Sequence, residues 1–132
     1  MLKLLAPIAL LTATSATAQM QSPCPAGTVE GVVRVSKLTP TGTMEGFKAA
    51  NADHAAWYKA NNNAALIFVA PVLDMVASQP PVVSTTQIMS ARIGGSYVAP
   101  AKRDAAWAAY VAKYQANSTM VSETFGCFPA LR

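Results

Sequence analysis

The spacing of apolar residues changes along the chain in an order that few small folds accommodate. Residues 28–38 alternate between apolar and polar, as a half-buried strand does, whereas residues 44–61 repeat apolar and aromatic positions three or four apart, as an amphipathic helix does. Turn-forming residues separate further segments of each kind. The sequence predicts, in the order strand, helix, strand, strand, helix, strand, the segments 28–38, 44–61, 64–73, 82–92, 100–117 and 119–128.

This order is that of the split βαβ, or ferredoxin-like, fold. Because crossover connections are right-handed, it predicts an antiparallel four-stranded sheet of order 4-1-3-2 with both helices on one face. The fold class expected is therefore an α+β βαββαβ sandwich, formed by one domain over residues 19–132.

The two cysteines flank this arrangement. Cys24 precedes the first predicted strand and Cys127 ends the last one. In the predicted sheet these strands are antiparallel neighbours, so the start of one lies beside the end of the other. Two cysteines in an oxidising compartment usually pair, and we expect a disulfide between them.

The first eighteen residues have the composition of a secretory signal. Lys3 precedes about ten apolar residues, far fewer than the ~20 that span a bilayer, and Ala16-Thr17-Ala18 forms an A-x-A cleavage site. We expect cleavage after Ala18, no membrane span, and a soluble product that is periplasmic or secreted.

Charge and missing motifs exclude several classes of function. Nine basic and six acidic residues remain after residue 18, scattered along the chain, with only Lys102 and Arg103 adjacent. A nucleic-acid-binding surface needs clustered basic residues, so none is expected. The sequence also has no phosphate-binding glycine loop, G-x-S-x-G, CxxC or HExxH motif. Kinase, hydrolase and zinc-enzyme functions, and a metal site, are therefore not indicated.

Apolar residues occupy both sides of the second predicted strand. Leu66 and Phe68 alternate with Ile67 and Val69, so one set faces away from the helices. An exposed apolar patch of several hundred Å² is unusual for a monomer. The pattern predicts a homodimer packed sheet to sheet, or a bound apolar ligand.

The two halves of the chain carry similar short segments. Asp53-His54-Ala55-Ala56-Trp57 is similar to Arg103-Asp104-Ala105-Ala106-Trp107, and Tyr58-Lys59-Ala60-Asn61 is similar to Tyr114-Gln115-Ala116-Asn117. These echoes favour a βαβ duplication.

With this element order and the segment from Asp53 to Tyr58 late in the first helix, the chain resembles the dimeric α+β barrel superfamily. That superfamily includes NIPSNAP-like, EthD-like and antibiotic-biosynthesis-monooxygenase-like domains. The resemblance implies two sheets paired across a two-fold axis and an apolar pocket between sheet and helices. Some members use the pocket for cofactor-free oxidation, some bind haem, and many have no assigned activity.

His54 is the single histidine and the main candidate for chemistry. A neutral imidazole near pH 7 could act as a base, a haem ligand or a pocket donor, or it could be a core histidine bonded to a backbone carbonyl. It lies on the aromatic side of the first predicted helix, beside Trp57 and Tyr58.

Three carboxylates are weaker candidates. Asp53 and Asp104 each precede a tryptophan and could form an acid–base pair, or they could be solvated or paired with Lys102 and Arg103. Glu123 lies in the last predicted strand and needs a partner if it is buried. Its expected cross-strand partners are Glu30 and Arg34.

Three functions remain open on these observations. The first is binding of a small apolar ligand in a site lined by His54, Trp57, Tyr58 and Phe68, without catalysis. The second is a cofactor-free or haem-dependent oxidase or monooxygenase that uses His54. The third is an envelope protein-interaction module that uses the bare sheet face.

Overall fold

A computed structural model of the protein describes residues 22–130 except residue 78. The predicted signal segment 1–18 and its cleavage site lie outside the described residues. The helices and strands are β1 (Thr28–Leu38), α1 (Met44–Ala60), β2 (Leu66–Asp74), β3 (Val82–Ile93), the 3₁₀ turn η1 (Pro100–Lys102), α2 (Ala105–Asn117) and β4 (Ser118–Pro129).

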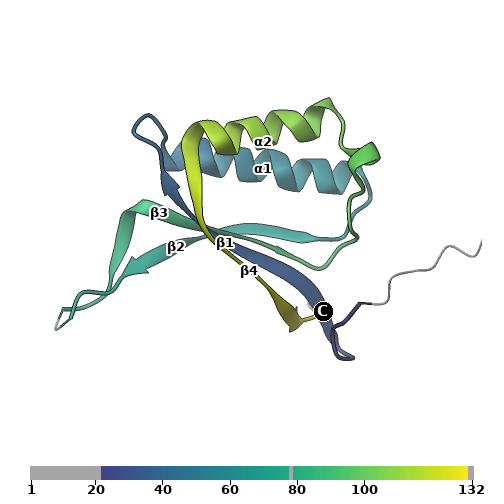
Figure 1. The fold of residues 1–132 in the computed structure, drawn as a ribbon, viewed down its shortest axis with the longest axis horizontal. Coiled ribbons are helices and arrows are strands. Elements are labelled where there is room, and N and C mark those ends of the chain that lie inside the picture. The colour runs from purple at the N-terminus through teal and green to yellow at the C-terminus, as the bar shows by residue number, and fades with distance from the viewer. Residues whose placement is uncertain (1–21, 78, 131–132) are drawn as a thin grey trace, which may run out of the picture.

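The four strands form one antiparallel sheet in the order β2-β3-β1-β4, and both helices lie on one face of it (Figure 1). This is the order 4-1-3-2 read from the other edge, so the predicted α+β ferredoxin-like class is confirmed. In the described part of the chain, no helix is both long enough and apolar enough to cross a bilayer.

The helix starts depend on their caps. Thr43 caps α1, since its hydroxyl accepts a hydrogen bond from the Gly46 amide at 2.9 Å. The predicted start of the second helix at Pro100 is wrong. Pro100–Lys102 form only the turn η1, and α2 begins at Ala105 because the Asp104 carboxylate accepts from the Trp107 amide at 2.9 Å.

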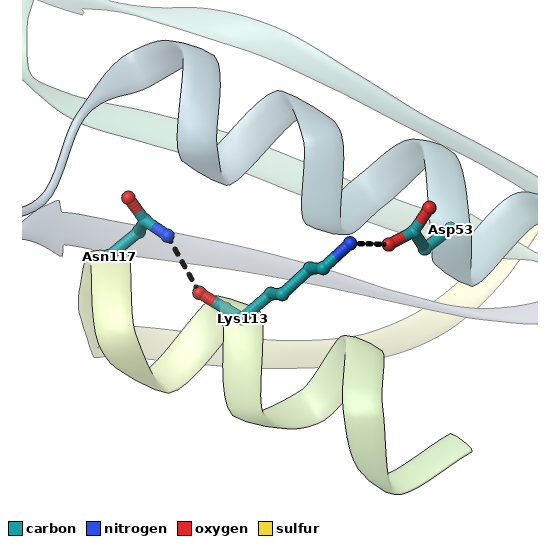
Figure 2. A network of polar contacts seen from close by, with 3 residues as sticks. All are labelled: Asp53, Lys113 and Asn117. Carbon is teal, nitrogen blue, oxygen red and sulfur yellow. Dashed lines mark hydrogen bonds and ion pairs between the residues drawn. The ribbon is translucent and has the colours of Figure 1, made fainter. Parts of the chain in front are cut away.

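Asn117 joins the end of α2 to the start of α1. Its Oδ1 accepts from the Thr43 amide at 3.1 Å, and its Nδ2 donates to the Lys113 carbonyl at 2.9 Å (Figure 2). A Cβ on Gly46 would lie 2.1 Å from Asn117 Oδ1, so only glycine allows this close approach. Lys113 also forms an exposed ion pair with Asp53 of α1, which links the two neighbouring helices (Figure 2).

The disulfide forms as expected between Cys24 and Cys127, whose Cα atoms are 5.5 Å apart. It lies where β1 and β4 meet in antiparallel register, with Thr28 opposite Pro129. The bridge therefore fastens the exposed edge strand β4 to the interior of the sheet. Such bridges are typical of proteins that function outside the cytoplasm.

The strand register determines which side chains face the helices. Ile67, Arg92 and Val32 lie opposite one another across the sheet, and Ile67 packs against the buried aromatic core beneath the helices. Phe68 lies opposite Ala91 and therefore on the other face. Phe68 and Leu66 are 37% and 43% exposed there. Of the two alternating sets of apolar residues on β2, the set with Leu66 and Phe68 therefore faces away from the helices.

Candidate functional site

A cavity of about 530 Å³ lies between the helices and the sheet. Aromatic side chains form much of its wall: Phe47, Tyr58, Trp107, Tyr110, Tyr114 and Phe125. Met120 and Phe125 of β4 also line it while remaining 55% and 69% exposed, so the cavity reaches the surface on the β4 side.

His54 lies among these rings on the inner side of α1. Its imidazole stacks on Tyr110, with centroids 4.6 Å apart and planes inclined by 15°. Tyr58 and Tyr114 meet it edge to face at 5.0 and 6.0 Å. The ring is 9% exposed and lines the cavity, which places this sequence candidate at the site.

A hydrogen-bond chain favours one tautomer of His54. Asn51 Nδ2 donates to the Tyr114 hydroxyl oxygen at 3.0 Å, and that hydroxyl lies 3.4 Å from His54 Nδ1. Because the phenol oxygen already accepts from Asn51, we assign its proton to the contact with Nδ1. The proton of the neutral imidazole is then on Nε2, which has no partner among the described residues.

Burial, with smaller contributions from the nearby Arg34 and Arg92 guanidinium groups, lowers the pKa of His54 to about 4. The imidazole is therefore neutral at pH 7. Burial also raises the pKa of Tyr114 to about 12, against the opposing effect of the Asn51 hydrogen bond. Both groups act as neutral hydrogen-bonding residues in the cavity wall.

The assigned tautomer presents a donor, and not a metal-binding nitrogen, to the cavity. Binding of a metal or of haem iron through Nε2 would need the opposite tautomer, with Nδ1–H donating to the Tyr114 hydroxyl. Both cysteines are in the disulfide, and residues 22–130 contain no cluster of three metal-ligating side chains.

Tyr110 has a buried hydroxyl without a partner. The residue is 3% exposed and lines the cavity, and its hydroxyl oxygen makes no hydrogen bond within the described residues. Burial raises the pKa of this phenol well above its usual range, so it remains protonated. An unsatisfied buried polar group is costly, which makes this hydroxyl a candidate for contact with a ligand.

Three arginines contribute positive charge to the wall. Arg34 pairs with Glu123 at 2.5 Å, which confirms one of the two partners expected for Glu123. Arg92 donates to the Gly94 carbonyl at 2.8 Å, and Arg103 donates to the Val98 carbonyl while lying 5.1 Å over the Trp107 ring. Among residues 22–130, Arg92 and Arg103 have no carboxylate partner.

Asp53 and Asp104 do not form an acid–base pair. Asp53 pairs with Lys113, while Asp104 accepts from the Trp107 amide and from the Trp57 indole at 2.8 Å. Both hydrogen bonds lower the pKa of Asp104, and the bond from the Trp107 amide has the larger effect. The alternative pairing of Asp104 with Lys102 or Arg103 does not occur, because its carboxylate accepts from the Trp107 amide and the Trp57 indole instead.

The four residues predicted to bind a ligand are not all brought together. His54 and Tyr58 line the cavity. Trp57 lies behind them, packed edge to face on Trp107 at 4.9 Å and buried. Phe68 lies on the other face of the sheet. The sequence alone indicates neither Arg92 nor Tyr110 as a pocket residue.

Trp57→Phe is expected to lower the free energy of unfolding by about 1–2 kcal/mol, because it removes a buried donor to Asp104 and some packing volume. Trp107→Phe is the matched control, since that half-buried indole has no hydrogen bond among the described residues, and it should cost less. In urea denaturation, Asp104→Ala should then have a smaller effect in the Trp57→Phe background than in the wild type. Equal effects in the two backgrounds would contradict the bond.

Comparison of the chain with protein-family models, curated proteins and solved structures finds no match. The geometry of the cavity is therefore the basis for assigning a function.

Proposed function

We propose that the protein binds a small, largely apolar ligand in the cavity between sheet and helices, without catalysis. The observation that carries this proposal is the 530 Å³ cavity itself. Protein interiors are close-packed and rarely keep such a space, whereas ligand pockets are about 300–1,000 Å³ and mostly apolar. Closing such a space would add packing contacts and stability, so a cavity that stays open favours a role in ligand binding.

The state of His54 favours binding over the alternative, an oxidase or monooxygenase with His54 as its base. A pKa of about 4 makes the imidazole neutral at pH 7 but only weakly basic. As a donor through Nε2 it still contributes directly to ligand recognition. The haem-dependent form of this alternative requires the opposite tautomer, in which Nδ1–H donates to Tyr114 and Nε2 binds iron.

We further propose that residues 1–18 direct export to the periplasm or the outside of the cell. The Cys24–Cys127 disulfide supports this location, since such bridges persist in oxidising compartments. Membership of the dimeric α+β barrel superfamily is likewise a proposal, supported by the element order and sheet order.

The bare sheet face is our candidate for a homodimer interface. Leu66 and Phe68 on β2 share this face with Val33, Val35 and Met89 of the neighbouring strands. A second copy would cover these side chains. The third function, binding of a different envelope protein, would use the same face.

Phe68→Asp is expected to convert the dimer to a folded monomer, because it places an unpaired charge in a desolvated interface. Size-exclusion chromatography with light scattering measures the change, and circular dichroism checks the fold. Met75→Asp adds the same charge at a 75% exposed apolar residue beyond β2 and should leave the dimer intact. An unchanged Phe68→Asp dimer would exclude this face as the interface.

Native mass spectrometry of gently purified mature protein tests ligand binding, and we expect an additional small-molecule mass. Binding of the neutral fluorescent probe N-phenyl-1-naphthylamine should give the same answer after the ligand is removed. Val111→Trp, which adds a ring to the cavity wall, should abolish probe binding. Ala112→Trp, at the exposed neighbouring position, should not. Probe binding that is equal in these two variants, or absent from the wild type, would contradict the proposal.

A further inference from the structure

Polar groups are concentrated on the sheet floor of the cavity, opposite the aromatic wall. Across the sheet, Arg34 lies opposite Ser90 and Val32 lies opposite Arg92, so both guanidinium groups project from the helix-covered face. Both are only partly exposed and both line the cavity. A purely apolar ligand would bury these charges without compensation, at a cost in free energy.

The charges of the cavity do not balance. The carboxylate of Glu123 neutralises Arg34, and Arg103 lies exposed at the rim against Trp107. Arg92 has one carbonyl acceptor, the Gly94 oxygen, for its five donor hydrogens. Arg92 is therefore the partly buried cation of the wall that has no carboxylate partner among the described residues.

Two neutral donors lie in the same wall. The Tyr110 hydroxyl is buried without a partner, and His54 presents an unpaired Nε2–H. Tyr110 and His54 are stacked, so both side chains lie in the same part of the wall. A single cation with two neutral donors matches one carboxylate, whose two oxygens accept bidentate and multiple hydrogen bonds. The aromatic wall matches a ring system, which prefers edge-to-face and offset contacts.

We propose that the ligand is an aromatic carboxylate, with its carboxylate held by Arg92 and the neutral donors His54 and Tyr110, and its rings held by the aromatic wall. This inference rests on the proposed ligand-binding function and names its ligand class. It also gives a role to the Tyr110 hydroxyl, whose buried and unpartnered state has no structural benefit. The half-buried position of Arg92 strengthens its hydrogen bonds to an anion relative to those at an open surface.

Calorimetric titration with 2-naphthoate and with 2-naphthylmethanol tests the charge, since the two probes share a ring system and differ in the carboxylate. We expect the wild type to bind naphthoate at least ten times more tightly. Arg92→Gln should weaken naphthoate about 10- to 100-fold and leave the alcohol within about twofold. Lys102→Gln removes an exposed charge outside the cavity and should change neither affinity.

Tyr110→Phe provides a second variant that keeps the fold. It should weaken naphthoate about three- to tenfold, while the melting temperature of the unliganded protein should stay the same or rise. Equal affinity of the wild type for both probes, with N-phenyl-1-naphthylamine still bound, would overturn the carboxylate proposal and leave the binding function standing. If the wild type binds none of the three probes, both the carboxylate proposal and the binding function are overturned.

Discussion

Replacing both cysteines, Cys24→Ser with Cys127→Ser, is expected to lower the free energy of unfolding by about 4 kcal/mol and the melting temperature by roughly 15 °C. The bridge joins residues separated by 103 positions, nearly the whole described chain. In the chain-entropy model, a closed loop of about 100 residues is stabilised by about 4–5 kcal/mol, because the bridge restricts the unfolded state.

Reduction of the wild type must reproduce this loss. Differential scanning fluorimetry with and without a strong phosphine reductant should show a large shift in the wild type and none in the double serine variant. A reductant-insensitive wild type with fully reduced thiols would show that the bridge contributes no stability.

The same bridge has a consequence for the cavity. Most β4 side chains are exposed, and β4 pairs with β1 alone, at the edge of the sheet. Met120 and Phe125 of this strand form one side of the cavity. Loss of the bridge frees the end of β4, so reduction should weaken ligand binding even at temperatures where the fold persists.

The arrangement of the elements could be predicted because each depends on local pattern. Strand alternation, helical periodicity and the crossover rule were sufficient to place the cysteines beside each other. The echoed Tyr-x-Ala-Asn segments also behave alike: Asn61 Nδ2 donates to the Trp57 carbonyl and Asn117 Nδ2 donates to the Lys113 carbonyl, each at 2.9 Å. The echo that ends in Ala-Ala-Trp has no such equivalence, since its first copy lies inside α1, whereas in its second copy Asp104 caps α2.

The start of α2 could not be predicted from local signals alone. Pro100 is a favourable first helical residue and Asp104 is a favourable cap, so the sequence offers two starts. The hydrogen bond from the Trp57 indole, on the other helix, favours the second. This contact is non-local and has no signature near residue 104.

The cavity had a sequence signal that was not used. Arg34 and Ser36 share one side of β1, and Ser90 and Arg92 share one side of β3, at alternate positions. Polar residues repeated on the covered side of two neighbouring strands indicate a polar floor in place of a packed core. The position of Phe68 could not be predicted from the sequence. The alternation along β2 defines two sets of side chains, and only the register with β3 shows which set faces the helices.

The stability of the protein should fall by up to about 3 kcal/mol as the pH is lowered from 6.5 to about 4, through His54 alone. The unfolded chain takes up a proton at this histidine near pH 6.5, whereas the folded protein does so only near pH 4. Within that window the unfolded state binds more protons, so acid favours unfolding. Above pH 6.5 neither state binds the proton, and this contribution to stability is complete and constant.

His54→Phe isolates the effect, because it keeps an aromatic ring among Tyr58, Tyr110 and Tyr114 and cannot be protonated. Urea denaturation of both proteins between pH 4 and 8 gives the difference in unfolding free energy at each pH. Carboxylates titrate in both proteins and cancel in that difference. We expect the wild type to lose stability relative to His54→Phe as the pH falls below 6.5. A difference that stays constant down to pH 4 would mean that the folded protein accepts a proton on His54 as readily as the unfolded chain does. The imidazole would then not be the buried neutral donor that the proposed carboxylate site requires.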